Sequence, residues 1–167
     1  MKRNRKLMSV IFFAMIVPIL ASGPMLAQVL TGDQLKKVVP TTFFFAGQVA
    51  SVQTRNSSSF KTSSGKIVTA GLVDTSGYAT AIAEKYQGFL ITETKLSFEG
   101  ASVEPGAYGF GFKDGKFLVM NIAGTDVTSV ASQNDDQVKH PVPLKFEKAD
   151  AGYRLYAGKN YVAFKAE

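Results

Sequence analysis

Hydrophobic and polar residues alternate along much of the chain after position 88, with the period of two that marks a β-strand with one buried face. The clearest run is Tyr108–Phe112, in which an aromatic ring occupies every second position and glycine fills the positions between. Turn residues interrupt the alternation at intervals of about ten residues, which is typical of all-β domains. The pattern predicts a mainly β fold, either a small antiparallel barrel or a sandwich of about eight strands.

Several turns and strands can be placed within this fold. Lys113-Asp114-Gly115-Lys116 is a strong hairpin signal, because an Asp-Gly pair readily adopts the positive φ angles of a tight turn. Thr42–Gln53 is predicted to be one strand. We expect the polar stretch 54–66 to form two turns around a short piece at Phe60, and residues 133–143 to form a loop.

A helical pattern covers residues 76–87, in the middle of the β-rich part. The preceding Asp74-Thr75-Ser76 are residue types that cap a helix N-terminus. Three bulky residues spaced four apart form one apolar stripe: Tyr78, Ile82 and Tyr86. We expect this amphipathic helix to pack on a sheet or to cap one opening, and a shorter helix to precede Pro40.

The first 27 residues follow a different pattern, that of a secretory signal peptide. Four basic residues within positions 2–6 precede an uncharged apolar run from Leu7 to Leu20, and small residues follow. The run has about 14 residues, fewer than the roughly 20 that span a membrane. We predict export by a Sec-type signal, cleavage after Ala27 or Gly23, and a periplasmic or extracellular product with no stable membrane insertion after cleavage.

The signal accounts for most of the excess basic charge. The whole chain carries 19 basic and 13 acidic residues, a formal charge of +6. Without the four basic residues of the signal, residues 28–167 carry 15 basic and 13 acidic residues, a charge of +2. This balance argues against nucleic acid as a partner, because such binding needs a basic face. A stretch of this length suits a single β-rich domain, residues 28–167.

The chain contains no cysteine, which excludes disulfides, thiolate metal ligands and a lipoprotein attachment site. His140 is the single histidine, and it shares a predicted loop with Asp135 and Asp136. Paired acids in a loop are usually a solvated surface, so we predict neither a metal site nor a cofactor.

Aromatic residues on two strands are the leading candidates for a ligand site. Tyr108, Phe110 and Phe112 share one face of their strand, and the glycines between them would leave room for a ligand or another backbone. Tyr153 and Tyr156 belong to the last predicted meander, where exposed rings could stack on sugars. The competing interpretation is that these rings fill the core.

No constellation of residues predicts catalysis. The segment Leu72–Gly77 resembles the aspartic-protease signature, a strand that ends in Asp-Thr-Gly, and this resemblance would make Asp74 a catalytic acid. Here Ser76 stands where that glycine belongs and the element occurs once, so a helix cap accounts for the same residues. Glu93 and Glu99, or Asp74, are the candidate acids of a carboxylate-dependent hydrolase.

These features together predict a non-enzymatic exported domain that binds a small apolar ligand or a protein partner. Two alternatives stay open: a carboxylate-dependent hydrolase, and a structural envelope-associated protein without a ligand.

Overall fold

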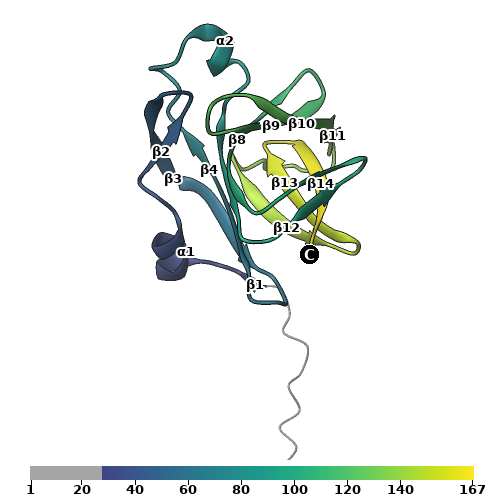
Figure 1. Ribbon diagram of the computed structural model, residues 1–167. Coiled ribbons are helices and arrows are strands. Elements are labelled where there is room, and N and C mark those ends of the chain that lie inside the picture. The colour runs from purple at the N-terminus through teal and green to yellow at the C-terminus, as the bar shows by residue number, and fades with distance from the viewer. Residues whose placement is uncertain (1–27) are drawn as a thin grey trace, which may run out of the picture.

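The computed structural model describes residues 28–167, and the predicted signal peptide lies outside them. Neither helix of these residues is long and apolar enough to cross a membrane. The elements follow one another along the chain as shown in Figure 1. Their bounds are β1 (Gln28–Val29), α1 (Gly32–Val38), β2 (Thr42–Phe45), β3 (Gln48–Lys61), β4 (Ile67–Val73), α2 (Thr80–Ala83), β5 (Gly88–Thr92), β6 (Leu96–Phe98), β7 (Ala101–Val103), β8 (Gly106–Lys113), β9 (Lys116–Asn121), β10 (Asp126–Ala131), β11 (Gln133–Asn134), β12 (Lys145–Ala149), β13 (Gly152–Ala157) and β14 (Asn160–Ala166).

The strands form two antiparallel sheets that pack face to face (Figure 1). The larger sheet has the order β1-β3-β4-β5-β8-β9-β10, with β2 paired to β3. The smaller sheet has the order β12-β13-β14-β6-β7, with β11 paired to β14. The sheets meet at their edges, where β12 lies against β3 and β7 against β10. Neither sheet closes on itself, so the mainly β prediction is confirmed as a sandwich rather than a barrel.

The main hydrophobic core fills the space between the two sheets. Phe60 and Phe110 of the larger sheet and Phe164 of the smaller one are at most 5% exposed. The Phe60 ring stacks on Tyr153 at 4.0 Å and meets Phe146 edge-on at 5.0 Å between centroids. Burying one such side chain contributes about 1.5–3 kcal/mol, so packed aromatics hold together a domain that has no disulfides.

A third layer covers the opposite face of the larger sheet. The β2–β3 hairpin and the segment around α2 bring Phe45, Tyr78 and Tyr86 onto this face, where they pack with Phe89. Phe45 and Tyr86 stack with their centroids 3.9 Å apart. The Phe45 ring can lie this close to β8 because residue 109 is glycine: a Cβ there would lie 2.4 Å from Cε2 of Phe45.

Two tight turns illustrate where sequence signals are strong and where they are weak. The hairpin predicted at Asp114-Gly115 is confirmed, with φ angles of 51° and 70° between β8 and β9. In contrast, the prediction of one strand over Thr42–Gln53 is wrong, since Ala46 and Gly47 form a turn with φ angles of 47° and 80°. Alanine rarely adopts a positive φ. Here the turn is held by the Ala46 N–H, which donates to the Ile122 carbonyl at 2.8 Å.

The polar stretch 54–66 also differs from its prediction, because β3 continues through it to Lys61. Its pairing with β4 shifts between Val52 and Ser57, after which three consecutive serines are buried. Their hydroxyl groups have partners within the fold. The Ser58 Oγ accepts from the Phe146 N–H at 3.0 Å, and the Ser59 Oγ donates to the Val68 carbonyl at 2.9 Å. Hydroxyls that are hydrogen-bonded can be buried at little cost.

The helix predicted over residues 76–87 is present but shorter, since α2 comprises four residues. The Asp74 carboxylate accepts from the Ser76 N–H at 3.0 Å and forms a local turn, so it does not cap the helix. Tyr78 stays outside the helix because its hydroxyl donates to the Phe45 carbonyl at 3.1 Å. A contact with the third layer thus overrides the helical spacing.

Candidate functional site

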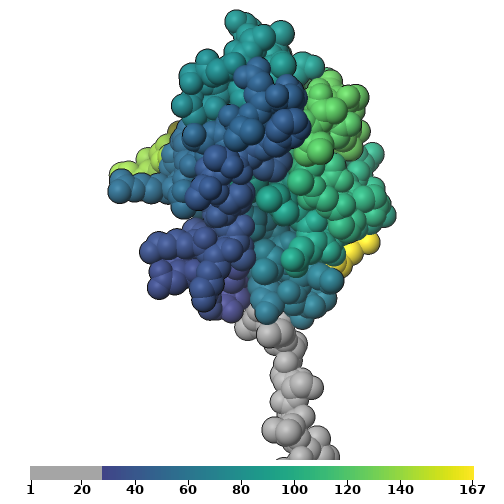
Figure 2. Space-filling view, turned by 60° about the vertical axis from the view of Figure 1, so that its left-hand side comes forward, coloured from purple at the N-terminus to yellow at the C-terminus, as the bar shows by residue number. Residues whose placement is uncertain are grey.

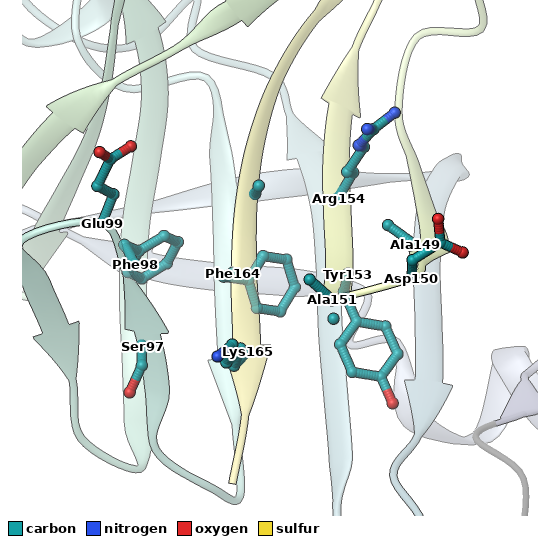
Figure 3. A pocket seen from close by; sticks show the side chains of 12 residues that line it. Ser97, Phe98, Glu99, Ala149, Asp150, Ala151, Tyr153, Arg154, Phe164 and Lys165 are labelled. Atoms are coloured by element: carbon teal, nitrogen blue, oxygen red, sulfur yellow. The ribbon is translucent and has the colours of Figure 1, made fainter.

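A groove of about 550 Å³ lies on the smaller sheet, over β6, β14 and β13 and beside the turn from β12 to β13 (Figure 3). Small residues leave this space open: Ala149 is paired with Gly152 on the neighbouring strand, and Ala151 and Ala163 also line the groove. The sandwich core lies beneath: Phe98, Tyr153 and Phe164 line the groove and also pack in the main core. The full lining is Ser97, Phe98, Glu99, Ala149, Asp150, Ala151, Gly152, Tyr153, Arg154, Ala163, Phe164 and Lys165.

The guanidinium of Arg154 is held in place beside the groove. It lies over the Tyr161 ring at 4.7 Å, within the range of a cation–π contact. Its Nη1 donates to the Tyr156 hydroxyl at 3.3 Å, and that hydroxyl donates to Oδ2 of Asp135 at 3.0 Å. The hydrogen bond to Tyr156 is the main reason that the pKa of Arg154 is raised. A guanidinium has five N–H donors in a planar fork, so donors remain for a further acceptor beside the groove.

Charges of both signs line the groove. Glu99 and Asp150 are acidic, whereas Arg154 and Lys165 are basic. Within residues 28–167 none of the four forms an ion pair with another side chain. A ligand with polar groups could therefore pair with them without breaking a contact between charged side chains of the protein.

The five aromatic residues predicted from sequence do not come together. Phe110 is fully buried in the main core, and Phe112 packs on it and on Phe117. Tyr108 is partly buried, and its hydroxyl donates to the Glu104 carbonyl at 2.9 Å. These three residues belong to the larger sheet, while the other two predicted residues belong to the smaller sheet.

The two predicted residues of the smaller sheet have different roles in the groove. Tyr153 lines it directly, and burial raises the pKa of its hydroxyl. Tyr156 is 1% exposed and does not line the groove. Its hydroxyl accepts a hydrogen bond from Arg154, which does line it. Burial is also the main reason that the pKa of Tyr156 is raised.

The space beside the β8 glycines is filled by the chain itself. The ring of Phe45 lies over Gly109, and a Cβ at Gly111 would lie 1.9 Å from the Lys85 carbonyl oxygen. The space beside Gly109 is thus taken by a side chain, and the space beside Gly111 by another part of the backbone.

The candidate acids lie at separate places in the fold. Asp74 is exposed, and the hydrogen bond from the Ser76 N–H holds the pKa of its carboxyl below the usual value, whereas a general acid needs a raised pKa. Glu93 accepts from the Ile67 N–H at 2.8 Å, while Glu99 lines the groove. No group of three or more His, Asp or Glu side chains in residues 28–167 is arranged to hold a metal ion.

Sequence reasoning missed Arg154, Ala163 and Lys165. The available signal was the alternation along the last two strands, which places Arg154 on the opposite face from the buried Leu155. That alternation locates outward-facing residues. It does not show that small side chains on neighbouring strands are paired so as to leave a hollow.

Comparison with known proteins gives no match for this chain among protein-family models, curated proteins or solved structures.

Proposed function

We propose that this chain is an exported, non-enzymatic binding module, and that its groove on the smaller sheet holds an extended segment of a protein partner. The observation that carries the proposal is the pre-oriented guanidinium of Arg154 beside an open groove formed by small residues. A side chain fixed before binding loses little entropy on binding.

The shape of the groove favours a segment of protein over an enclosed small molecule. Pockets for small ligands bury most of the ligand surface, whereas this groove lies open along the outer side of a sheet (Figure 3). Charges of both signs suit a peptide, whose backbone and side chains offer donors and acceptors together. A small apolar ligand is the competing occupant.

Photo-crosslinking in the producing cells tests the proposal. We expect a photoreactive amino acid at Ala163, in the groove, to form an adduct with one defined peptide segment, identified by mass spectrometry. The same group at Ala107, an exposed residue of β8 outside the groove, is the matched control. Arg154→Ala should lower the yield at position 163 by about tenfold, because a hydrogen bond to a charged group contributes about 1.5–3 kcal/mol.

Three outcomes would contradict this proposal. Equal adduct yields from positions 163 and 107 would remove the groove as the binding site. An adduct that Arg154→Ala leaves unchanged would remove the role of the guanidinium. An adduct with a lipid or another small apolar molecule, in place of a peptide, would establish the competing occupant.

Export is the second part of the proposal, and it is supported by the basic, apolar and small-residue regions of the first 27 residues. The mature protein should be recovered outside the cytoplasm with Gln28 or Pro24 as its first residue, as measured by intact mass and N-terminal sequencing. Recovery of a chain that retains Met1 in the cytoplasm would refute this part alone.

A further inference from the structure

The groove on the smaller sheet continues past β14 into a second, smaller hollow. Glu99 and Ala163 line the groove and also line this hollow, which has a volume of about 100 Å³. The other residues around the hollow belong to β10, β11 and β14, and they are Val130, Ala131, Gln133 and Val162. An extended segment in the groove can therefore run across the strands, from the β12–β13 turn over β14 and on toward β10.

Two opposite charges flank this path at the level of Ala163. Arg154 of β13 is paired with Ala163 of β14. On the other side of β14, Glu99 comes one position after Phe98, which is paired with Phe164. Figure 3 shows Arg154 and Glu99 on either side of the strand that carries Phe164. Since neighbouring strands lie about 4.8 Å apart, the Cα atoms of Arg154 and Glu99 are about 10 Å apart, with only a methyl side chain between them.

Both charges are available to an occupant of the groove. Within residues 28–167 neither Arg154 nor Glu99 takes part in an ion pair. Arg154 is already oriented by its hydrogen bond and its cation–π contact, whereas Glu99 is exposed in the turn between β6 and β7. The other two charges of the groove, Asp150 and Lys165, are also opposite in sign, so the groove has no net charge. A preference among segments therefore depends on where their charges lie, and not on the sum of those charges.

We propose that the groove selects a segment with two opposite charges: an acidic side chain that pairs with Arg154 over β13, and a basic side chain that pairs with Glu99 over β6. This selection requires that a peptide segment occupies the groove, and it therefore rests on the proposed function. Side chains two positions apart in an extended chain point to the same side, at a spacing of about 7 Å. The flexible stem of a lysine covers the remaining difference.

Charge complementarity favours such a segment over other occupants. An apolar molecule in the groove would desolvate charges of both signs without giving them partners, which is unfavourable. A segment with two like charges would pair with one of the two residues and place its second charge beside a side chain of the same sign. Arg154 and Glu99 are thus the specificity-determining residues of the proposed site.

Fluorescence anisotropy with short labelled peptides tests this selection. The peptides consist of serine and alanine and differ only at two residues separated by one alanine. These two residues are Glu and Lys in either order, Glu and Glu, Lys and Lys, or two further alanines. We expect the wild-type protein to bind one of the Glu/Lys peptides at least about tenfold more tightly than the peptides with like charges or none, because charge-assisted hydrogen bonds are the strong ones. High salt should reduce this preference.

A charge reversal at Glu99 tests which residue sets the preference. Glu99→Lys should weaken binding of the preferred Glu/Lys peptide by about tenfold and make the Glu/Glu peptide the tightest. Glu99→Gln, which removes the charge without reversing it, should abolish the discrimination at that residue, and it serves as a second variant if the reversal impairs folding.

Asp33→Lys is the matched control, because it changes the net charge by the same amount outside the groove. Asp33 belongs to α1, and its ion pair with Lys36 is exposed, so the loss of this pair costs little. Figure 2 shows α1 on the face of the molecule turned toward the viewer, while the yellow β14 appears only at the margin. We expect Asp33→Lys to keep the wild-type preference.

Three results would overturn this inference. They are equal binding of the Glu/Lys and the alanine peptides, a preference that Glu99→Lys leaves as unchanged as Asp33→Lys does, and the absence of binding by every peptide at about 1 mM. The proposed function would still stand after any of them if photo-crosslinking at Ala163 captured a peptide. Equal adduct yields from positions 163 and 107 would instead refute the proposed function, and the charge selection with it.

Discussion

At the scale of single residues, Tyr86 is the side chain whose chemistry conflicts most with its surroundings. Its ring is fully buried between Phe45 and Tyr78, where aromatic contacts stabilise it. Its hydroxyl is the one buried side-chain polar atom in residues 28–167 that has no hydrogen-bond partner. Burial, together with the nearby Tyr78, raises the pKa of this hydroxyl well above its ordinary value. The ring therefore contributes to packing while the hydroxyl opposes it.

We predict that Tyr86→Phe increases the free energy of unfolding by about 1 kcal/mol, because an unpartnered buried hydroxyl costs about 1–3 kcal/mol. Chemical denaturation measures this change. Tyr156→Phe is the matched control: it removes a buried hydroxyl that bonds with Asp135 and Arg154, so it should destabilise the protein. A loss of stability in Tyr86→Phe equal to that of the control would show that the Tyr86 hydroxyl has a partner.

At the scale of elements, the contact between β8 and the β2–β3 hairpin depends on the missing side chain at Gly109. Gly109→Ala should destabilise the protein by about 1–3 kcal/mol, since its Cβ would lie 2.4 Å from the Phe45 ring. Gly77→Ala is the control, because its Cβ would lie 3.6 Å from the nearest atom, Oε1 of Gln48. Thermal unfolding compares the two. Equal melting temperatures would indicate that the third layer can shift to accept the methyl group.

An ion pair joins the segment of α2 to β8, and it gives the second prediction at this scale. The Lys113 Nζ lies 2.6 Å from Oε2 of Glu84, and this hydrogen bond holds the pKa of Glu84 below its usual 4.5. A lowered pKa in the folded state stabilises the protein above the unfolded-state pKa, and this stability is lost as the pH falls through the folded-state value.

Glu84→Gln should therefore lower the melting temperature slightly at pH 7 and have no effect once the pH lies well below 4.5. The effect at pH 7 should shrink in high salt, because the pair is exposed. Asp136→Asn, at an exposed acid outside the ion pairs of residues 28–167, should change the melting temperature at neither pH. If the melting temperature of Glu84→Gln stays below that of the wild-type protein in acid as well, the loss of stability comes from packing and not from the ion pair.

At the scale of the whole molecule, the two sheets are joined by more than apolar contacts. The buried Ser58 Oγ of β3 accepts from the Phe146 N–H of β12, at the edge where the two sheets meet. This is a contact between residues 88 positions apart in the chain. It satisfies a backbone donor that would otherwise be buried without a partner.

Ser58→Ala should lower the free energy of unfolding by about 1–3 kcal/mol, because it leaves the Phe146 N–H unpaired. Ser51→Ala, at an exposed serine of the same strand, should change it by less than about 0.5 kcal/mol. Denaturant unfolding by circular dichroism measures both variants. Similar values for the two would mean that water replaces the serine at this edge.

The class of the fold was predictable because it follows from local periodicity. Alternating residues and the Asp114-Gly115 turn suffice to indicate strands and a hairpin, since side chains on a strand point to opposite faces. The absence of cysteine and the near-neutral charge of residues 28–167 are likewise properties of composition alone. These features require no knowledge of which segments meet.

Three features could not be predicted from the sequence, because they depend on contacts between distant segments: the groove, the hairpin turn at Ala46 and the buried serines. Ala46 tolerates its positive φ because Ile122 accepts its N–H, and Ser58 tolerates burial because Phe146 donates to it. Tyr78 and Tyr86 have helical spacing, yet the third layer draws both rings inward and limits α2 to one turn. Whether a residue lies in a core or beside a groove is settled by its neighbours on other strands, and pairing between strands is a property of the folded chain.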